Sequence, residues 1–219
     1  MQLLNQHKNE TLKIISLINL KINFLLVIIF LLPFSIIKAQ NDGETYLESL
    51  QNKFNTIQDF TANIDQSISG KSSISGKIFF KKENNFRIEF GNTLIVSDGK
   101  SSWNYNKKEN KVIITEYDGD GSLFSIDYLV YQFPSQCTIK GEPDGNLRKL
   151  TLTPKSRTTN LGEVTIWINE NDLIEKIQTN DSAAGLMEIN FSNINLNQNL
   201  PGSNFQFSPP QESKIIDLR

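Results

Sequence analysis

A period-two alternation of apolar and polar residues, running through most of the chain after residue 59, sets its fold class more than any other feature. Phe86, Ile88 and Phe90, for example, alternate with Arg87 and Glu89. Such alternation is typical of β-strands with one apolar and one polar face. Short segments rich in Gly, Asn and Asp, which favour turns, separate the alternating stretches. We expect strands at residues 60–68, 74–80, 86–90, 94–97, 101–106, 111–116, 136–141, 147–153, 163–168, 173–179, 186–191 and 194–197.

One amphipathic helix is expected before the first strand. Leu47, Leu50, Phe54 and Ile57 recur at helical spacing, which predicts a helix over residues 44–58. The chain is therefore expected to be mainly β, with about eleven short strands in an antiparallel meander, either a sandwich or a curved, partly closed barrel.

Two later segments depart from the alternation. Residues 118–133 are apolar on several sides, and we expect a short helix or loop there that lies over the sheet. The segment from Phe205 to Pro210 is expected to be an edge strand, after which the chain loses regular structure.

The first forty residues differ in kind from the rest. Three lysines precede an apolar run from Phe24 to Leu32, and a small alanine then leads into polar residues. A basic lead, a short apolar run and a small residue describe a secretory signal peptide. A membrane-spanning helix needs about 20 apolar residues, and Pro33 interrupts this run. We expect residues 1–40 to be a cleaved signal peptide and residues 41–219 to be one domain; an uncleaved anchor or a buried helix is the alternative.

The residues after position 40 offer little for catalysis or metal binding. The only histidine, His7, lies in the predicted signal peptide, which excludes a Ser/His/Asp triad, a Cys/His pair and a histidine metal site. The single cysteine, Cys137, is interpreted as a small core residue. Asp118-Gly119-Asp120-Gly121 resembles part of a calcium loop without its other ligands. Nothing places the carboxylates of Glu116 and Asp118 in a cleft. We expect no enzyme, metal or cofactor.

The charge balance argues against nucleic acid as a partner. Residues 1–40 carry four of the 22 basic residues and one of the 24 acidic residues, so the rest of the chain has a net charge of −5. An acidic chain without a basic patch binds nucleic acid poorly.

The predicted strands carry an unusually apolar face. It is interpreted either as an ordinary sandwich core or as the wall of a cavity for an apolar ligand, which periodicity alone cannot decide. The candidate cavity residues are Ile78, Phe80, Phe86, Ile88, Phe90, Leu94, Val96, Trp103 and Tyr105.

Four segments, in order along the chain, resemble the outer-membrane lipoprotein carrier family LolA. Residues 94–106, LIVSDGKSSWNYN, are similar to the family segment "ILVSDGK-x-x-W-x-Y". Residues 76–86 resemble its "G-x-L-x-x-K-R-P-x-x-F" hairpin, residues 152–155 its "LTPK", and residues 205–211 its "FTFTPP" ending. The resemblance covers residues 44–217.

The resemblance implies an unclosed antiparallel β-barrel with an α-helical lid over an apolar cavity. In the family, this cavity holds the acyl chains of lipoproteins in the periplasm. An inner-membrane ABC-type lipoprotein releasing complex loads the carrier, and an outer-membrane lipoprotein acceptor receives the cargo. We expect this chain to be a periplasmic, monomeric carrier of the same kind that moves lipoproteins from the inner to the outer membrane.

The resemblance also implies roles for single residues. Lys82 occupies the position of a functionally important arginine, and Phe86 that of a cavity phenylalanine, although Lys82-Glu83 stands where the family has Arg-Pro. Lysine keeps the charge and loses the planar fork of donors. A solvated turn lysine is the alternative. The expected lid and gating residues are Lys82, Leu123, Phe124 and Ile126. Asp98-Gly99 is interpreted as a hairpin turn.

Two other functions stay open on the sequence. The same fold could serve as a lipid or lipoprotein sensor, or carry another envelope lipid. A packed interior without a pocket would favour a structural β scaffold, and a buried set of convergent acids would favour a hydrolase.

Overall fold

A computed structural model describes residues 42–71, 73–117, 123–156, 161–181 and 185–219 of the chain. The predicted signal peptide and the Asp118–Gly121 segment lie outside these ranges. The helical elements are α2 (Gly43–Asn55), the π-helix η1 (Tyr128–Gln132) and the 3-10 helices η2 (Phe133–Gln136) and η3 (Gly202–Phe205). The strands are β1 (Asp59–Ile68), β2 (Ile74–Lys81), β3 (Asn85–Phe90), β4 (Thr93–Asp98), β5 (Ser101–Asn106), β6 (Lys111–Glu116), β7 (Cys137–Asp144), β8 (Leu147–Pro154), β9 (Val164–Ile168), β10 (Ile174–Asp181), β11 (Gly185–Leu196) and β12 (Lys214–Asp217).

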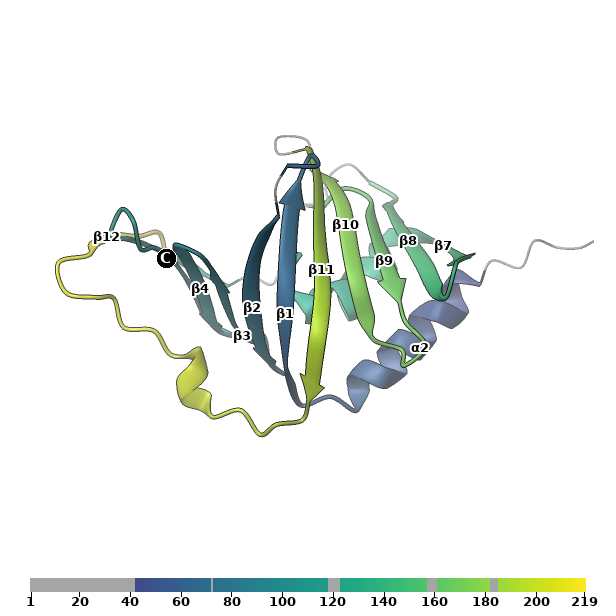
Figure 1. Ribbon diagram of the computed structural model, residues 1–219, viewed down its shortest axis with the longest axis horizontal. Helices are drawn as coiled ribbons and strands as arrows, with labels where there is room; N and C mark the ends of the chain where they lie inside the picture. The colour runs from purple at the N-terminus through teal and green to yellow at the C-terminus, as the bar shows by residue number, and fades with distance from the viewer. Residues whose placement is uncertain (1–41, 72, 118–122, 157–160, 182–184) are drawn as a thin grey trace, which may run out of the picture. The chain divides into compact units, whose positions relative to one another are not determined.

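Within the described ranges, the twelve strands form one sheet in the order β12-β6-β5-β4-β3-β2-β1-β11-β10-β9-β8-β7 (Figure 1). The sheet does not close, because β12 and β7 remain as edges. The pairs are antiparallel except for β12, which pairs in parallel with β6. The expectation of an unclosed antiparallel barrel with a few helices is therefore confirmed. The expected loss of structure near the C-terminus is wrong for Lys214–Asp217, whose backbone pairs with β6.

One face of the sheet, which we call the helix face, is covered by helical segments. Cross-strand pairing places Phe60, Phe80 and Phe86 side by side on this face. Helix α2 buries Leu50 and Phe54 against it, and the Phe54 and Phe80 ring centroids are 5.5 Å apart. The spacing of the apolar residues in α2 gives a single buried stripe, which is why the helix lies flat against the sheet.

The connection between β6 and β7 supplies the second cover of the helix face. We call its residues 123–136 the lid. Leu123, Ile126, Leu129 and Phe133 are buried in the main core. The short helix or loop expected over the sheet is thus present as η1 and η2, and Pro134 at the start of η2 suits a position that needs no amide donor.

The opposite face, which we call the tail face, is covered in part by the C-terminal residues 197–217. The chain leaves β11 beside the buried Asp59, whose carboxylate accepts hydrogen bonds from the N–H groups of Gln198 (2.7 Å) and Leu200 (3.1 Å). Helix η3 then contacts β3 and β4, and its Phe205 is buried. The chain crosses to the far edge of the sheet and ends in β12 (Figure 1).

Candidate functional site

An apolar cavity lies on the helix face between α2 and the strands β1, β10 and β11. Its volume, counted as the space open to the centres of water molecules, is ≈ 40 Å³. Apolar side chains form nearly all of the wall, and Lys53 and Asp172 are its two charged residues. The complete lining is Leu50, Lys53, Phe54, Ile57, Phe60, Ile126, Asp172, Leu173, Ile174, Phe191, Ile194 and Leu196.

The size of this cavity decides what it can hold. One water needs about 10–15 Å³ on the same measure, so the space corresponds to a few water molecules and is far smaller than an acyl chain. Around it the core is filled, because Ile64, Ile78, Ile88 and Ile177 are completely buried. A long apolar guest can therefore enter only if α2 or the lid moves away from the sheet.

Polar contacts that hold α2 and the lid together converge on the last turn of the helix. The Nζ of Lys82, in the β2–β3 turn, donates a hydrogen bond of 2.9 Å to the carbonyl oxygen of Asn55. The hydroxyl of Tyr131 in η1 donates to the side-chain oxygen of the same Asn55. One turn earlier, the Gln51 amide donates to the Val130 carbonyl oxygen at 2.9 Å. The end of α2 is thereby joined to both the lid and the sheet.

A carboxyl group is buried at the same junction. Oδ2 of Asp127 has no hydrogen-bond partner among the described residues. Burial raises the pKa of Asp127 above its usual range, against the opposing effects of the Asn84 backbone N–H and the positive charge of Lys82. Burial at this junction therefore disfavours the charged form of Asp127 relative to the protonated form.

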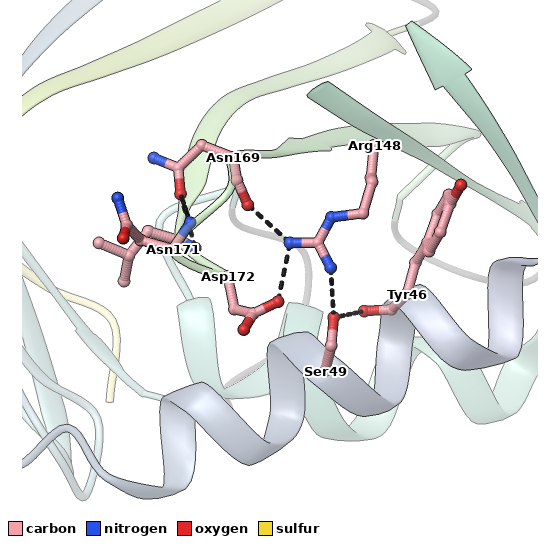
Figure 2. Close-up of polar contacts among 7 residues, drawn as sticks. Tyr46, Ser49, Arg148, Asn169, Asn171 and Asp172 are labelled. Atoms are coloured by element: carbon pink, nitrogen blue, oxygen red, sulfur yellow. Dashed lines mark hydrogen bonds and ion pairs between the residues drawn. The ribbon is translucent and has the colours of Figure 1, made fainter. Parts of the chain in front are cut away.

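A second polar cluster fastens the opposite side of α2 (Figure 2). Arg148 of β8 donates to the hydroxyl of Ser49 (3.0 Å), the carbonyl oxygen of Asn169 (2.6 Å) and Oδ1 of Asp172 (2.7 Å). Its guanidinium also lies 5.8 Å from the centroid of the Tyr46 ring. One arginine thus joins α2, β8 and the β9–β10 turn; we call it and its three hydrogen-bond partners the Arg148 clasp.

The structure brings five of the nine predicted cavity residues together on the helix face. Ile78, Phe80, Phe86, Ile88 and Phe90 all belong to the main core. The predicted lid residues Leu123, Phe124 and Ile126 lie over the same face, with Phe124 in ring contact with Phe90 at 5.8 Å. Ile126 is the one predicted site residue that also lines the ≈ 40 Å³ cavity.

The other four, Leu94, Val96, Trp103 and Tyr105, lie on the tail face, whereas the sequence analysis had placed all nine on one face. The two-residue turn Gly91-Asn92 pairs Phe90 with Thr93, so Ile95 rather than Leu94 continues the helix face. Leu94 and Val96 pair with Tyr105 and Trp103 on the opposite side. There the Tyr105 ring packs 5.7 Å from Phe207 of the C-terminal segment. The C-terminal segment therefore covers apolar side chains on this part of the tail face.

Sequence reasoning missed most of the actual cavity lining. Phe191, Ile194 and Leu196 come from the end of β11. Leu173 comes from the β9–β10 turn, and Ile174 is the first residue of β10. Their apolar character was visible in the sequence, but their position beside α2 follows from the pairing of β1 with β11. That pairing joins segments more than a hundred residues apart, which no local pattern reveals.

The described residues contain no group of three or more His, Cys, Asp or Glu side chains placed to hold a metal ion. Cys137 is buried in the core as predicted, and burial raises the pKa of its thiol to about 11. Glu116 is exposed at the end of β6. Asp98-Gly99 forms the predicted hairpin turn, with Asp98 Oδ1 accepting from the N–H groups of Lys100 and Ser101. Among the helices of the described ranges, none has the length and apolarity needed to cross a bilayer.

A single open, mainly antiparallel sheet, covered on one face by a helix and a helical connection, defines the class of β proteins to which this chain belongs. The crystal structure of an uncharacterized conserved protein from Thermus thermophilus has this fold, with a TM-score of 0.55, 14% sequence identity, and coverage of 80% of this chain and 98% of that one. At this identity the likeness supports the fold alone.

Comparisons of the amino-acid sequence identify the family of this chain within that class of β proteins. Residues 55–208 match the model of the family "Outer membrane lipoprotein carrier protein LolA". An outer-membrane lipoprotein carrier protein of Legionella pneumophila is 26% identical over 202 residues, covering 86% of this chain and 98% of the relative. The protein of the same name from Haemophilus ducreyi is 25% identical over 186 residues, covering 79% and 85%. The chain belongs to the LolA family.

Proposed function

We propose that this protein is an exported, non-enzymatic carrier that binds the acyl chains of lipoproteins against the helix face and moves lipoproteins from the inner to the outer membrane. Family membership and the names of the relatives support a lipoprotein carrier role. The observation that carries the proposal is the apolar cavity beneath α2, whose two covers are fastened by a few polar contacts at their margins.

The energetics of an acyl anchor explain why such covers are needed. Each buried methylene contributes about 0.8 kcal/mol, so a lipoprotein anchor crosses water too slowly without a carrier. A permanently open apolar surface would bind other proteins or aggregate. Helices that close over the sheet in the absence of cargo avoid this cost, and helices that lift away expose enough apolar surface to hold the chains.

The proposal extends to the cellular context. Residues 1–40 act as a signal peptide that is cleaved, which delivers residues 41–219 to the periplasm as a single, monomeric domain. There an inner-membrane ABC-type releasing complex loads the carrier, and an outer-membrane acceptor unloads it. The helix-face residues Ile78, Phe80, Phe86, Ile88 and Phe90 form the wall of the opened cavity, and Lys82, Leu123, Phe124 and Ile126 take part in closing it.

The test uses half-buried residues, because a charge at the fully buried Ile88 would unfold the protein. Ile194→Glu places a carboxylate in the cavity wall, and Phe124→Glu places one on the lid. Both variants should lose at least tenfold in the amount of lipoprotein that co-purifies from the periplasm, measured by mass spectrometry. Trp103→Glu is the matched control, because Trp103 is half-buried on the tail face and should leave the yield unchanged.

Circular dichroism of each variant establishes that it is folded. Undiminished lipoprotein in folded Ile194→Glu and Phe124→Glu contradicts the cavity assignment. Free lipids or phospholipids in place of lipoproteins would instead favour a carrier of another envelope lipid or a lipid sensor with the same fold.

A further inference from the structure

The Arg148 clasp lies beside the cavity. Asp172 belongs to both: its Oδ1 accepts the 2.7 Å hydrogen bond from Arg148, and the residue also forms part of the cavity wall. The neighbouring Leu173 and Ile174 continue that wall. On the facing helix, Ser49 takes part in the clasp and Leu50 lines the cavity. The clasp therefore joins the two walls of the cavity, α2 and the β9–β10 turn.

The two sides of α2 are fastened by different chemistry. Toward the lid, rings pack together, with the Phe54 and Tyr131 centroids 5.9 Å apart, and Gln51 bonds to Val130. Toward the β9–β10 turn, Arg148 donates one hydrogen bond to Ser49 of the helix and another to Asp172 of the turn. Its side chain is 27% exposed and that of Asp172 is 38% exposed, so water can replace these bonds at small cost.

We propose that the Arg148 clasp is the gate of the cavity: acyl chains enter between α2 and the β9–β10 turn when Arg148 releases Ser49 and Asp172, while the helix stays attached to the lid. The inference rests on the proposed carrier function and names the route to its binding site. Arg148 is a positioning residue, because it holds α2 in place and does not line the cavity.

The geometry favours this side for entry. Retaining the lid contacts keeps the ring packing and core burial of Ile126 and Leu129, which contribute far more than an exposed ion pair. Opening on the Arg148 side exposes the cavity wall of β10 and β11 directly. It also leaves Lys82 bonded to Asn55 at the end of α2, so the helix can pivot there.

The test compares Arg148→Met with Arg87→Met. Methionine keeps much of the apolar stem and removes the donors. Arg87 is the matched control, because its side chain is also 27% exposed and also makes a 2.7 Å ion pair, with Glu89, but it lies on the tail face. Stopped-flow fluorescence measures how fast each protein takes up dansyl-labelled undecanoic acid. Arg148→Met should take up the probe roughly three- to tenfold faster than the wild type, the effect of losing about one partly exposed charged contact.

Hydrogen exchange of the folded proteins gives a second readout. Amides of residues 46–51 should exchange faster in Arg148→Met, while those of β1 and β11 should not change. Ser49→Ala, which removes one clasp partner on α2, should shift both measurements in the same direction by less. If the wild-type protein takes up the probe and both Arg148→Met and Ser49→Ala take it up at the wild-type rate, the gate proposal is wrong. The carrier proposal is not affected by that result. Wild-type protein that takes up neither the probe nor lipoprotein overturns both.

Discussion

Asp127 shows how a single buried carboxyl can set the stability of the lid. Its pKa is raised because burial disfavours the charged form, so the folded protein holds this proton more tightly than the unfolded chain does. Its favourable contribution is therefore present below the ordinary aspartate pKa of about 3.9 and is lost as the pH rises through the raised value. Above that raised pKa, the charged group opposes closure of the lid.

Asp127→Asn should remove this effect. The variant is expected to be more stable than the wild type at pH 7, and the difference should shrink as the pH falls toward 4, because the wild-type carboxyl takes up its proton as the pH falls. Urea unfolding midpoints at the two pH values measure this. Glu116→Gln, at an exposed acid, is the control and should give no such difference. A variant less stable than the wild type at pH 7 would contradict the assignment.

Lys82 illustrates how far sequence reasoning reaches at the scale of one residue. Its position in a turn and its charge were readable from the sequence, and the resemblance suggested a gating role. The hydrogen-bond partner of Lys82 could not be predicted from the sequence, because the Asn55 carbonyl oxygen is 27 residues away on another element. Arg148, which makes more contacts than Lys82, carried no sequence signal beyond its charge.

At the scale of elements, the C-terminal segment after β11 shields apolar side chains of the tail face from water. Phe205 is buried in η3, whereas Phe207, two residues later, is only half-buried against Tyr105. Phe205→Ala should lower the free energy of unfolding by about 3–5 kcal/mol, measured by urea denaturation. Phe207→Ala is the natural comparison and should cost clearly less. Equal losses from the two substitutions would show that burial does not decide the contribution of the tail.

The elements themselves were largely predictable. The helix expected at 44–58 is found at Gly43–Asn55, and most of the expected strands agree closely with the structure. Two expectations differ: 186–191 and 194–197 merge into β11, and the edge strand expected from Phe205 to Pro210 is absent, because Phe205 ends the 3-10 helix η3 and the residues after it up to Pro210 pair with no strand. The assignment of faces failed at Gly91-Asn92, where a two-residue turn reverses the parity of the alternation. The length of this turn could be read from the sequence, and a turn of two residues fixes the register of the strands that it joins. No sequence pattern predicts the parallel strand β12, because its pairing with β6 depends on the path of the C-terminal segment that precedes it.

At the scale of the whole molecule, residues 1–40 should be absent from the protein as it works in the cell. Cleavage by signal peptidase near Ala39 or Gln40 is expected, because a small residue follows a basic lead and a short apolar run there. The intact mass of protein purified from the periplasm measures the cleavage position. Replacing Ala39 with a bulky residue is the control, and should cause the longer chain to accumulate. Full-length protein recovered from membranes would instead support an uncleaved anchor.

The place of the lid in the chain has a consequence for cargo. Strand β6 lies next to one edge of the sheet and β7 forms the other edge, and the lid lies in the chain between these two strands. A cover joined to the sheet at only one end could move aside without moving the strands of the sheet. The chain joins this cover to a strand on each side of the sheet. Under the proposed function, a guest that moves these two strands apart must therefore also lengthen the path between them, and the number of residues in the connection limits how wide that guest can be.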